Sequence, residues 1–287
     1  MTLRTLDRFP GALEAHLALF TRPRRGRSAA DVGRVGFRRA GVAPEPERLA
    51  RYRGLVGLGD DGSLPPFYPQ LVAAPLHLAI LGDPAFPFPA MGLVHLANAI
   101  EELAPIASAA VLDLEAELVS ARDVSSGVVF ELETRAFVDG ALAWRSITTA
   151  LRRLRSSGKK VGGDAAVARP RPDRRFTFDA PESMGRRYAE VAGDRNPIHQ
   201  HALLARPFGF PRAIVHGTWT AARTLASFPE LLPSRPRRID VRFRAPVPLP
   251  STVEAIGWAR GEGVFLEARS RVDGALHLEI DVARLSP

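Results

Sequence analysis

The chain has 287 residues, of which 46% are apolar and 24% charged, the composition of a folded protein rather than a disordered or fibrous one. No apolar run reaches the roughly 18 residues that a membrane helix needs. Charged side chains interrupt the apolar residues near the N-terminus, which therefore lack the continuous apolar stretch of a secretory signal. The absence of cysteine excludes disulfides, thiolate metal sites and thiol nucleophiles. We therefore expect a cytoplasmic protein without a membrane span.

The formal charge of +8 would by itself suit a polyanionic partner such as nucleic acid. Only Lys159 and Lys160 are lysines, which leaves 37 arginines, and the chain is also rich in Ala, Gly and Pro, as a GC-biased genome produces. The arginines are scattered through every segment, and no nucleic-acid-binding motif accompanies them. We expect no nucleic-acid partner, and a basic nucleic-acid-binding module is an alternative that rests on charge alone.

The first half of the chain, residues 1–155, is predicted to hold helices followed by strands. A helix is expected at residues 47–55 and an apolar helix at residues 70–81. Four strand-like runs follow, at residues 93–103, 110–120, 128–137 and 142–154. Buried helices followed by long antiparallel strands indicate an α+β fold.

A polar stretch rich in glycine and proline, residues 156–174, is typical of a linker, and we place a domain boundary there. In the second half, residues 175–287, a short strand is expected first, and then a helix at residues 181–192 with Pro181 at its first position. Gly193 ends that helix, and Asn196 caps a short one. An apolar helix at residues 217–228 and four strands complete the half, the strands at residues 239–244, 252–259, 264–271 and 276–285.

Short identities recur in the two halves in the same order. The pentapeptide at residues 138–142 recurs at residues 272–276, an offset of 134 residues. Two further matches support it, Ala104-Pro105-Ile106 with Ala245-Pro246-Val247 and Arg51-Tyr52 with Arg187-Tyr188. Three anchors in one order at similar offsets indicate two copies of one structural unit. Each copy is predicted to be a long helix wrapped by a curved antiparallel sheet.

The segment from Tyr188 to Gly217 carries polar side chains spaced for acid-base chemistry. Asp194 is expected in the loop between two helices. His199 is expected one turn into the second helix, whose positive end would keep the imidazole neutral and able to act as a base. Together they could hold the water needed to hydrate an activated double bond. The backbone N–H of Gly217, at the first turn of an apolar helix, could donate to a developing enolate oxygen.

Two runs of this segment, Ala-Gly-Asp-Arg-Asn-Pro-Ile-His at residues 192–199 and Gly-Phe-Pro-Arg-Ala-Ile-Val-His-Gly at residues 209–217, resemble the signature of the MaoC-like dehydratases. This family includes the (R)-specific enoyl-CoA hydratases and related 3-hydroxyacyl-thioester dehydratases. Residues 86–106 resemble the first half of the double-hotdog members. The resemblance therefore covers nearly the whole chain.

The resemblance implies two hotdog repeats that form a pseudo-dimer with one active site. The family's catalytic aspartate and histidine fall on Asp194 and His199, and the oxyanion glycine, which binds the thioester carbonyl, falls on Gly217. Asn196, with Pro197, is expected to position the loop. The implied reaction is reversible syn addition of water to a trans-2-enoyl thioester, which gives the (R)-3-hydroxyacyl thioester. It requires no metal or redox cofactor, and coenzyme A or acyl carrier protein carries the acyl group.

Other positions refine this expectation. Ala192 stands where a serine is common in the family and Thr218 where a methionine is common, and both substitutions bear on substrate preference. Tyr188 and His216 are expected as structural or supporting residues. The first half lacks Asn-Pro-x-His, so it is predicted to be inactive and to form the tunnel for the acyl chain.

Two alternatives stay open at this point. A catalytically silent acyl-thioester-binding hotdog protein is the alternative function, although the intact Asp-x-Asn-Pro-x-His run argues against it. For the assembly, both a monomeric pseudo-dimer and a homodimer are compatible with the predicted fold.

Overall fold

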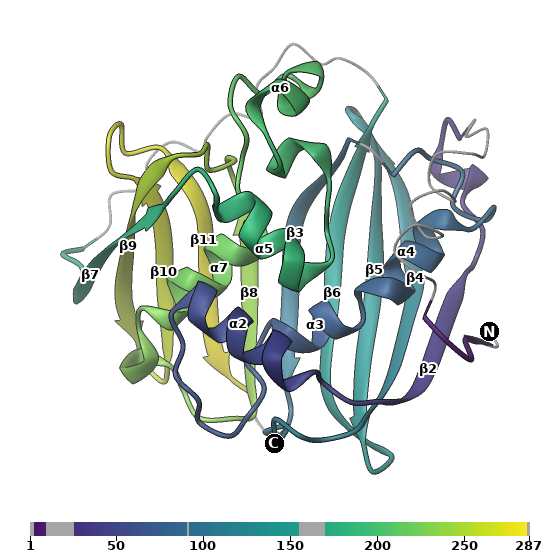
Figure 1. Cartoon of the computed structure of the whole chain (residues 1–287), viewed down its shortest axis with the longest axis horizontal. Helices are drawn as coiled ribbons and strands as arrows, with labels where there is room; N and C mark the ends of the chain where they lie inside the picture. Colours follow the sequence, from purple (N-terminus) through teal and green to yellow (C-terminus); the bar gives the residue numbers. More distant parts are fainter. Residues whose placement is uncertain (1–2, 10–25, 91, 155–169, 286–287) are drawn as a thin grey trace. The chain divides into compact units, whose positions relative to one another are not determined.

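The computed structural model describes residues 3–9, 26–90, 92–154 and 170–285. Figure 1 shows the elements along the chain. Contacts divide the chain into two units. One consists of Met1–Pro46 and Gly62–Gly158, and the other of Glu47–Asp61 and Lys159–Pro287. No helix in the described ranges has the length and hydropathy of one that crosses a bilayer.

The first unit is built on an antiparallel sheet. Its strands lie in the order β2 (Gly36–Val42), β4 (Leu112–Val124), β5 (Gly127–Val138), β6 (Ala141–Arg153) and β3 (Leu93–Glu102). The two-residue strand β1 (Arg4–Thr5) pairs with β2 in parallel. In the first half of β4 every second side chain is buried, as expected for a sheet with one face on the core.

The apolar helix predicted at residues 70–81 is in fact two helices, α3 (Tyr68–Val72) and α4 (Ala74–Gly82). Pro75 lies in the first turn of α4, where the lack of an N–H costs little. In one continuous helix the residue at this position would have to donate to the carbonyl of Leu71, which proline cannot do. The prediction of a single long helix in the first half is therefore wrong.

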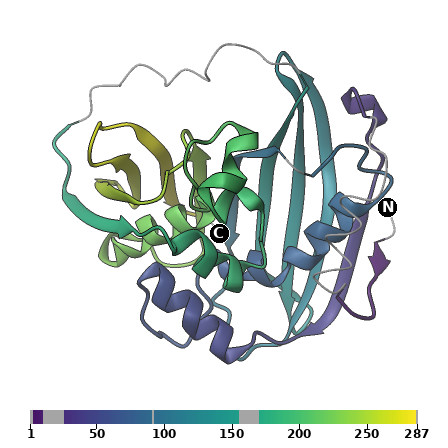
Figure 2. The same cartoon turned by 45° about the horizontal axis from the view of Figure 1, so that its top comes forward.

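The second unit repeats the strand order of the first. Its strands lie in the order β7 (Arg174–Ala180), β9 (Ser251–Arg260), β10 (Gly263–Ser270), β11 (Leu276–Arg284) and β8 (Arg237–Phe243), all antiparallel. Helix α7 (Gly217–Ala226) packs on β10 and β11, and Figure 2 shows how strongly these strands curve. The order matches β2-β4-β5-β6-β3 element by element, which confirms the two copies that the sequence repeat predicts.

The repeated pentapeptide lies at the turn of a β-hairpin in each unit, but the two turns differ in length. In the first unit it joins β5 to β6, and Asp139 and Gly140 have φ of 50° and 78°. In the second unit it joins β10 to β11, with Gly274 at φ 71°. Asp-Gly pairs are favoured in tight hairpins because these positions require positive φ. Positive φ accounts for the glycine at this place in both copies, but not for the aspartate, because Asp273 lacks the positive φ of Asp139 and lies in a longer loop, residues 271–275.

The predicted strands are present in both units, but one helix begins later than predicted and one strand was not predicted. Helix α5 (Met184–Ala192) begins three residues later than predicted, because Pro181 belongs to a preceding turn in which its carbonyl accepts from the N–H of Met184. Strand β2 was not predicted. Its sequence, GFRRAGV, has no sustained apolar alternation, and none of its residues after Phe37 is buried.

The end of the predicted linker is also corrected. Residues 155–169, which include most of the linker, lie outside the described residues. From Pro170 onward the chain is attached to β9. The indole Nε1 of Trp258 donates to the carbonyl of Pro170 at 2.9 Å, and Asp173 N–H donates to Gly257 at 3.0 Å. Residues 170–173 therefore belong to the second unit rather than to a free linker.

Helix α2 (Pro46–Val56) was predicted to belong to the first repeat, but all of it after its first residue belongs to the second unit. The indole Nε1 of Trp219, in α7, donates to the carbonyl of Leu55 at 2.9 Å. The rings of Tyr52 and Tyr188 lie 6.2 Å apart. Both views show α2 beside α5 and α7 (Figures 1 and 2). Sequence order gave no sign of this attachment, because the contacts join residues more than 130 positions apart.

These contacts predict a specific effect of Trp219→Phe. The substitution removes the N–H that holds the Leu55 carbonyl, so we expect the free energy of unfolding to fall by about 1–3 kcal/mol. Amide hydrogen exchange should be faster in α2 than in the parent protein. Trp258→Phe is the matched control, because it removes an indole bond to Pro170 instead. Equal protection of α2 in both variants would contradict the assignment of α2 to the second unit.

Candidate active site

The loop that carries Asp194 begins at the end of α5. Gly193 ends this helix with φ 74°, a left-handed conformation that glycine adopts without strain. The cap predicted at Asn196 is present: its side chain accepts from Ile198 N at 3.3 Å. Asp194 Oδ1 accepts from the backbone N–H of Asn196 at 3.1 Å, so the two side chains brace the same loop. Pro197 then starts a short 3-10 helix.

The short helix that was predicted after Asn196 is present as a single 3-10 turn, Pro197–His199. A turn of three residues has little dipole, so the dipole cannot be what keeps His199 neutral. The structure supplies another cause. The side chain of His199 is buried, and burial lowers the pKa of the imidazole below its usual 6.5, while the nearby Asp194 and the hydrogen bond with the Ile214 carbonyl act in the opposite direction.

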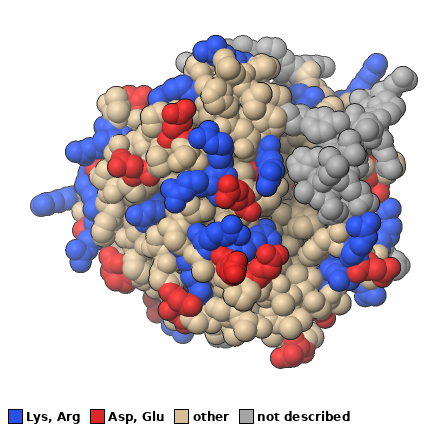
Figure 3. Space-filling view, viewed as in Figure 1, with Lys and Arg blue, Asp and Glu red and all other residues tan. Residues whose placement is uncertain are grey.

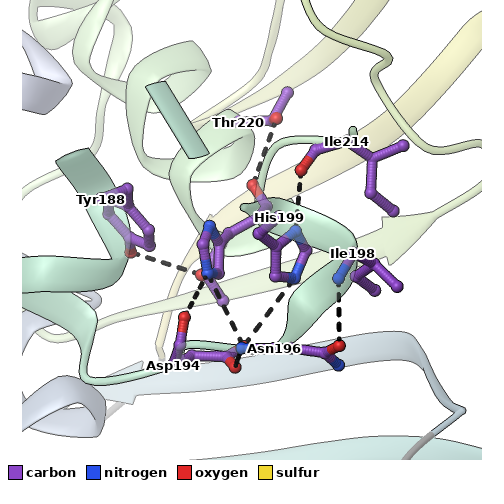
Figure 4. Close-up of polar contacts among 9 residues, drawn as sticks. Tyr188, Asp194, Asn196, Ile198, His199, Ile214 and Thr220 are labelled. Atoms are coloured by element: carbon purple, nitrogen blue, oxygen red, sulfur yellow. Dashed lines mark hydrogen bonds and ion pairs between the residues drawn. The ribbon is translucent and has the colours of Figure 1, made fainter. Parts of the chain in front are cut away.

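His199 presents one definite nitrogen to Asp194 (Figure 4). Its Nδ1 lies 2.8 Å from the carbonyl oxygen of Ile214, and because a carbonyl only accepts, Nδ1 carries the hydrogen. In the neutral ring, Nε2 therefore has a lone pair, and it faces Asp194 Oδ2 at 3.9 Å. Two acceptors at this separation do not bond to each other. A water about 2.8 Å from each atom would satisfy both.

His216 lies against both residues. It is buried, and its Nε2 lies 3.0 Å from the backbone carbonyl of Asp194 and 3.8 Å from Asp194 Oδ2. Its ring stacks on that of His199, with centroids 3.7 Å apart and planes at 25°. Burial, and next the neighbouring His199, lower the pKa of His216 to about 3. His216 is therefore neutral at physiological pH.

Asp194, His199 and His216 have possible metal-ligand atoms within 4.8 Å of one another, and two histidines with a carboxylate can bind transition metals. The geometry of the two histidine rings does not favour metal binding. An ion shared by two stacked rings would lie well out of both ring planes, whereas imidazole coordinates in its plane. The Nε2–H of His216 also already donates to the Asp194 carbonyl. The arrangement suits proton transfer better than metal binding.

Gly217 is the first residue of α7, where the N–H groups of the first turn have no partner within the helix. A Cβ at this position would come within 2.8 Å of Cε1 of Phe243, in β8. Next to it, the hydroxyl of Tyr188 donates to Thr218 Oγ1 at 3.3 Å. Tyr188 is fully buried, which raises the pKa of its phenol, so Tyr188 is a neutral donor.

Gly185, in α5, was not predicted as a site residue, yet its lack of a side chain allows this helix to approach His199. A Cβ on residue 185 would lie 2.0 Å from the carbonyl oxygen of His199, far closer than side chains come to other atoms. The signal was available in the sequence. A glycine inside a helix costs about 1 kcal/mol relative to alanine, so it calls for a packing reason.

Gly185→Ala should therefore lower the free energy of unfolding by about 2–4 kcal/mol, because helix α5 and the His199 backbone must separate. Gly54→Ala is the matched control, since Gly54 also lies in a helix but has nothing within 4 Å of the added methyl group. That variant should be more stable than the parent by about 0.5–1 kcal/mol. Urea denaturation measures both, and a change of the same sign in the two variants would refute the argument.

Comparison with known proteins places this geometry in a family. The family model described as "MaoC like domain" matches residues 164–277, which include the whole candidate site. The chain is 32% identical over 249 residues to 3-hydroxyacyl-thioester dehydratase X of Mycobacterium tuberculosis, covering 84% of this chain and 86% of that protein. It is 26% identical over 206 residues to the peroxisomal enoyl-CoA hydratase 2 of Arabidopsis thaliana, covering 65% of this chain and 66% of that protein.

Solved structures extend the likeness to both units. A crystal structure of HtdX of Mycobacterium tuberculosis matches with a TM-score of 0.76 and 30% identity, covering 87% of this chain and 99% of that one. A second Mycobacterium tuberculosis protein, described as a double hotdog fold, matches with a TM-score of 0.59 and 15% identity, covering 90% of this chain and 98% of that one. The predicted α+β double-hotdog fold is thereby confirmed, and the chain belongs to the MaoC-like dehydratase family.

Proposed function

We propose that this chain is a hydro-lyase that reversibly adds water to trans-2-enoyl thioesters to give (R)-3-hydroxyacyl thioesters. The observation that carries the proposal is the lone pair of His199 Nε2 facing Asp194 Oδ2 at 3.9 Å, with Nδ1 fixed on the Ile214 carbonyl. This arrangement suits a water held by two proton acceptors. The relatives named as a hydroxyacyl-thioester dehydratase and an enoyl-CoA hydratase support the same reaction class.

In the hydration direction, the Asp194–His199 pair takes a proton from the water as the water oxygen bonds to the β-carbon. The double-bond electrons move toward the thioester, and an enolate forms. The backbone N–H of Gly217 donates to the enolate oxygen, where negative charge develops. The protonated pair then returns the proton to the α-carbon. Because one pair handles both steps, hydroxyl and hydrogen add to the same face.

The remaining parts of the proposal concern the surroundings of this chemistry. Asn196 and Pro197 would hold the loop that carries Asp194. The reaction needs no metal or redox cofactor, and coenzyme A or acyl carrier protein would carry the acyl group. We propose a cytoplasmic location and an assembly that is either a monomer or a homodimer. The first unit keeps its predicted role as the inactive half that forms the acyl tunnel.

The distribution of charge supports a small acyl substrate over nucleic acid. On the face in Figure 3, basic side chains are interspersed with acidic ones rather than gathered into a patch of one sign. Several arginines along the strands bond to carboxylates, among them Arg244 with Glu279 and Arg269 with Glu267, each at 2.7 Å. Arginines paired in this way add little to the attraction of a polyanion.

Asp194→Asn tests the proposed chemistry. Because the amide cannot take a proton from water, kcat for hydration of trans-2-enoyl-CoA should fall by about 10²–10⁴. The measurement is loss of the enoyl-thioester ultraviolet absorbance, with chiral analysis of the product. Asp281→Asn is a matched control in the same unit, since its side chain is 53% exposed against 55% for Asp194.

An unchanged rate in Asp194→Asn would overturn the assignment. The silent-binding alternative makes a different prediction. The parent protein would then bind enoyl thioesters of short, medium and long chains, on coenzyme A and on acyl carrier protein, but would turn over none of them.

The pH dependence tests the state of His199. A base must be unprotonated, so activity should be complete above the pKa of His199 and lost as pH falls through it. Because burial lowers this pKa, the acid limb of kcat/KM should have its midpoint below pH 6.5. It should also coincide with the titration of the His199 imidazole followed by nuclear magnetic resonance. A limb at or above pH 6.5 would contradict the neutral, buried imidazole.

A further inference from the structure

His216 contacts the Asp194 loop, the His199 ring and the first turn of α7. It is the N-cap residue of α7, directly before Gly217, and its side chain is 4% exposed. The proposed reaction gives it no task. We propose that His216 is the positioning residue that fixes Asp194 and His199 relative to each other. The expected effect on catalysis rests on the proposed function, whereas the contacts of His216 with Asp194 and His199 are independent of it.

The first contact fixes the loop of Asp194. His216 Nε2 lies 3.0 Å from the Asp194 carbonyl, which can only accept, so Nε2 carries the hydrogen and Nδ1 does not. Nδ1 is then a buried acceptor, and it has no hydrogen-bond partner among the described residues. Such an atom reduces stability, and an apolar ring would fill the same space without that cost. Packing alone therefore does not explain a histidine here, whereas the bond from Nε2 does.

The second contact fixes the ring of His199. The Ile214 carbonyl holds one edge of this ring through Nδ1, at 2.8 Å. The ring of His216 covers one of its faces, with centroids 3.7 Å apart. Rotation of the His199 ring would break the edge contact and the stack together. The hydrogen bond at Nδ1 and the stack with His216 together therefore keep Nε2 of His199 directed toward Asp194.

His216 is itself held by elements other than the loop. Its carbonyl accepts from Thr220 N at 3.2 Å and from Thr220 Oγ1 at 3.4 Å, which attaches it to the first turn of α7. The ring of Tyr188, in α5, lies 5.0 Å from its own ring. Figure 4 shows Tyr188, Thr220 and Asp194 around the stacked rings. His216 thus links the exposed loop of Asp194 to helices α5 and α7, which restricts the movement of that loop.

The same contacts distinguish positioning from direct catalysis. The hydrogen of Nε2 is committed to a backbone carbonyl, and Asp194 Oδ2, at 3.8 Å, is beyond hydrogen-bond distance. His216 therefore acts through Asp194 and His199 rather than on the substrate.

Two substitutions separate the two contacts. His216→Phe keeps a ring that can stack but removes the N–H, and His216→Gln keeps an N–H at a similar distance from the backbone but removes the ring. His277→Phe is the matched control. His277 is also 4% exposed, its Nδ1 lies 3.3 Å from the Ala245 carbonyl, and its Nε2 has no hydrogen-bond partner among the described residues.

In His216→Phe we expect kcat for trans-2-enoyl-CoA to fall about tenfold to a hundredfold, because a small displacement of reacting groups has effects of this size. KM should change by less than about threefold, since the Gly217 N–H stays in place. His216→Gln should retain more of kcat than His216→Phe. His277→Phe should lose stability but keep kcat.

A spectroscopic measurement makes the inference independent of turnover. With ¹⁵N-labelled histidine, the parent protein at neutral pH should show His199 protonated at Nδ1 and His216 at Nε2. In His216→Gln, which lacks the stacked ring, the His199 signal should become a mixture of tautomers, whereas in His216→Phe it should stay at Nδ1. An unchanged kcat in His216→Phe would overturn the inference, as would an unchanged His199 signal in His216→Gln or an equal loss of kcat in His277→Phe. If the tautomers behave as expected while the parent protein turns over no enoyl thioester, the positioning role stands and the proposed function fails.

Discussion

The hydrogen bond from His199 Nδ1 to the Ile214 carbonyl is the constraint on which the candidate site depends. A neutral imidazole has one N–H and one lone pair, so an acceptor at one nitrogen decides that the other is the base. That acceptor is rigid. Ile214 N donates to the Ile198 carbonyl, and Ile214 forms a β-bridge with Pro248, so its backbone cannot turn away. The direction of the base is thus set by main-chain structure.

The rest of the second unit brings helices close enough for this arrangement to form. Gly185 removes a side chain where α5 meets the His199 carbonyl, and Gly217 removes another where α7 meets Phe243. Helix α2 completes the packing from a distant part of the sequence, through the bond from Trp219 to Leu55. Two glycines and one indole N–H therefore allow the close packing of the elements around Asp194, His199 and His216.

Sequence predicted the parts of the fold that depend on local pattern. The strands after residue 93, the end of α5 at Gly193 and the cap at Asn196 follow from alternation, positive φ and side-chain capping. It failed where a local pattern was ambiguous or absent. The helix predicted at residues 70–81 is broken before Pro75, and strand β2 lacks an apolar alternation that could be recognised.

The sequence alone determined the two-copy architecture, the family resemblance and the proximity of Asp194 to His199, because repeats and closely spaced motifs are written along the chain. Only the tertiary structure decided the unit to which α2 belongs, the cause of the neutral state of His199, and the central place of His216. The physical reason is common to all three. Burial, stacking and hydrogen bonds to backbone carbonyls depend on distances between segments, which folding sets and residue order does not encode locally.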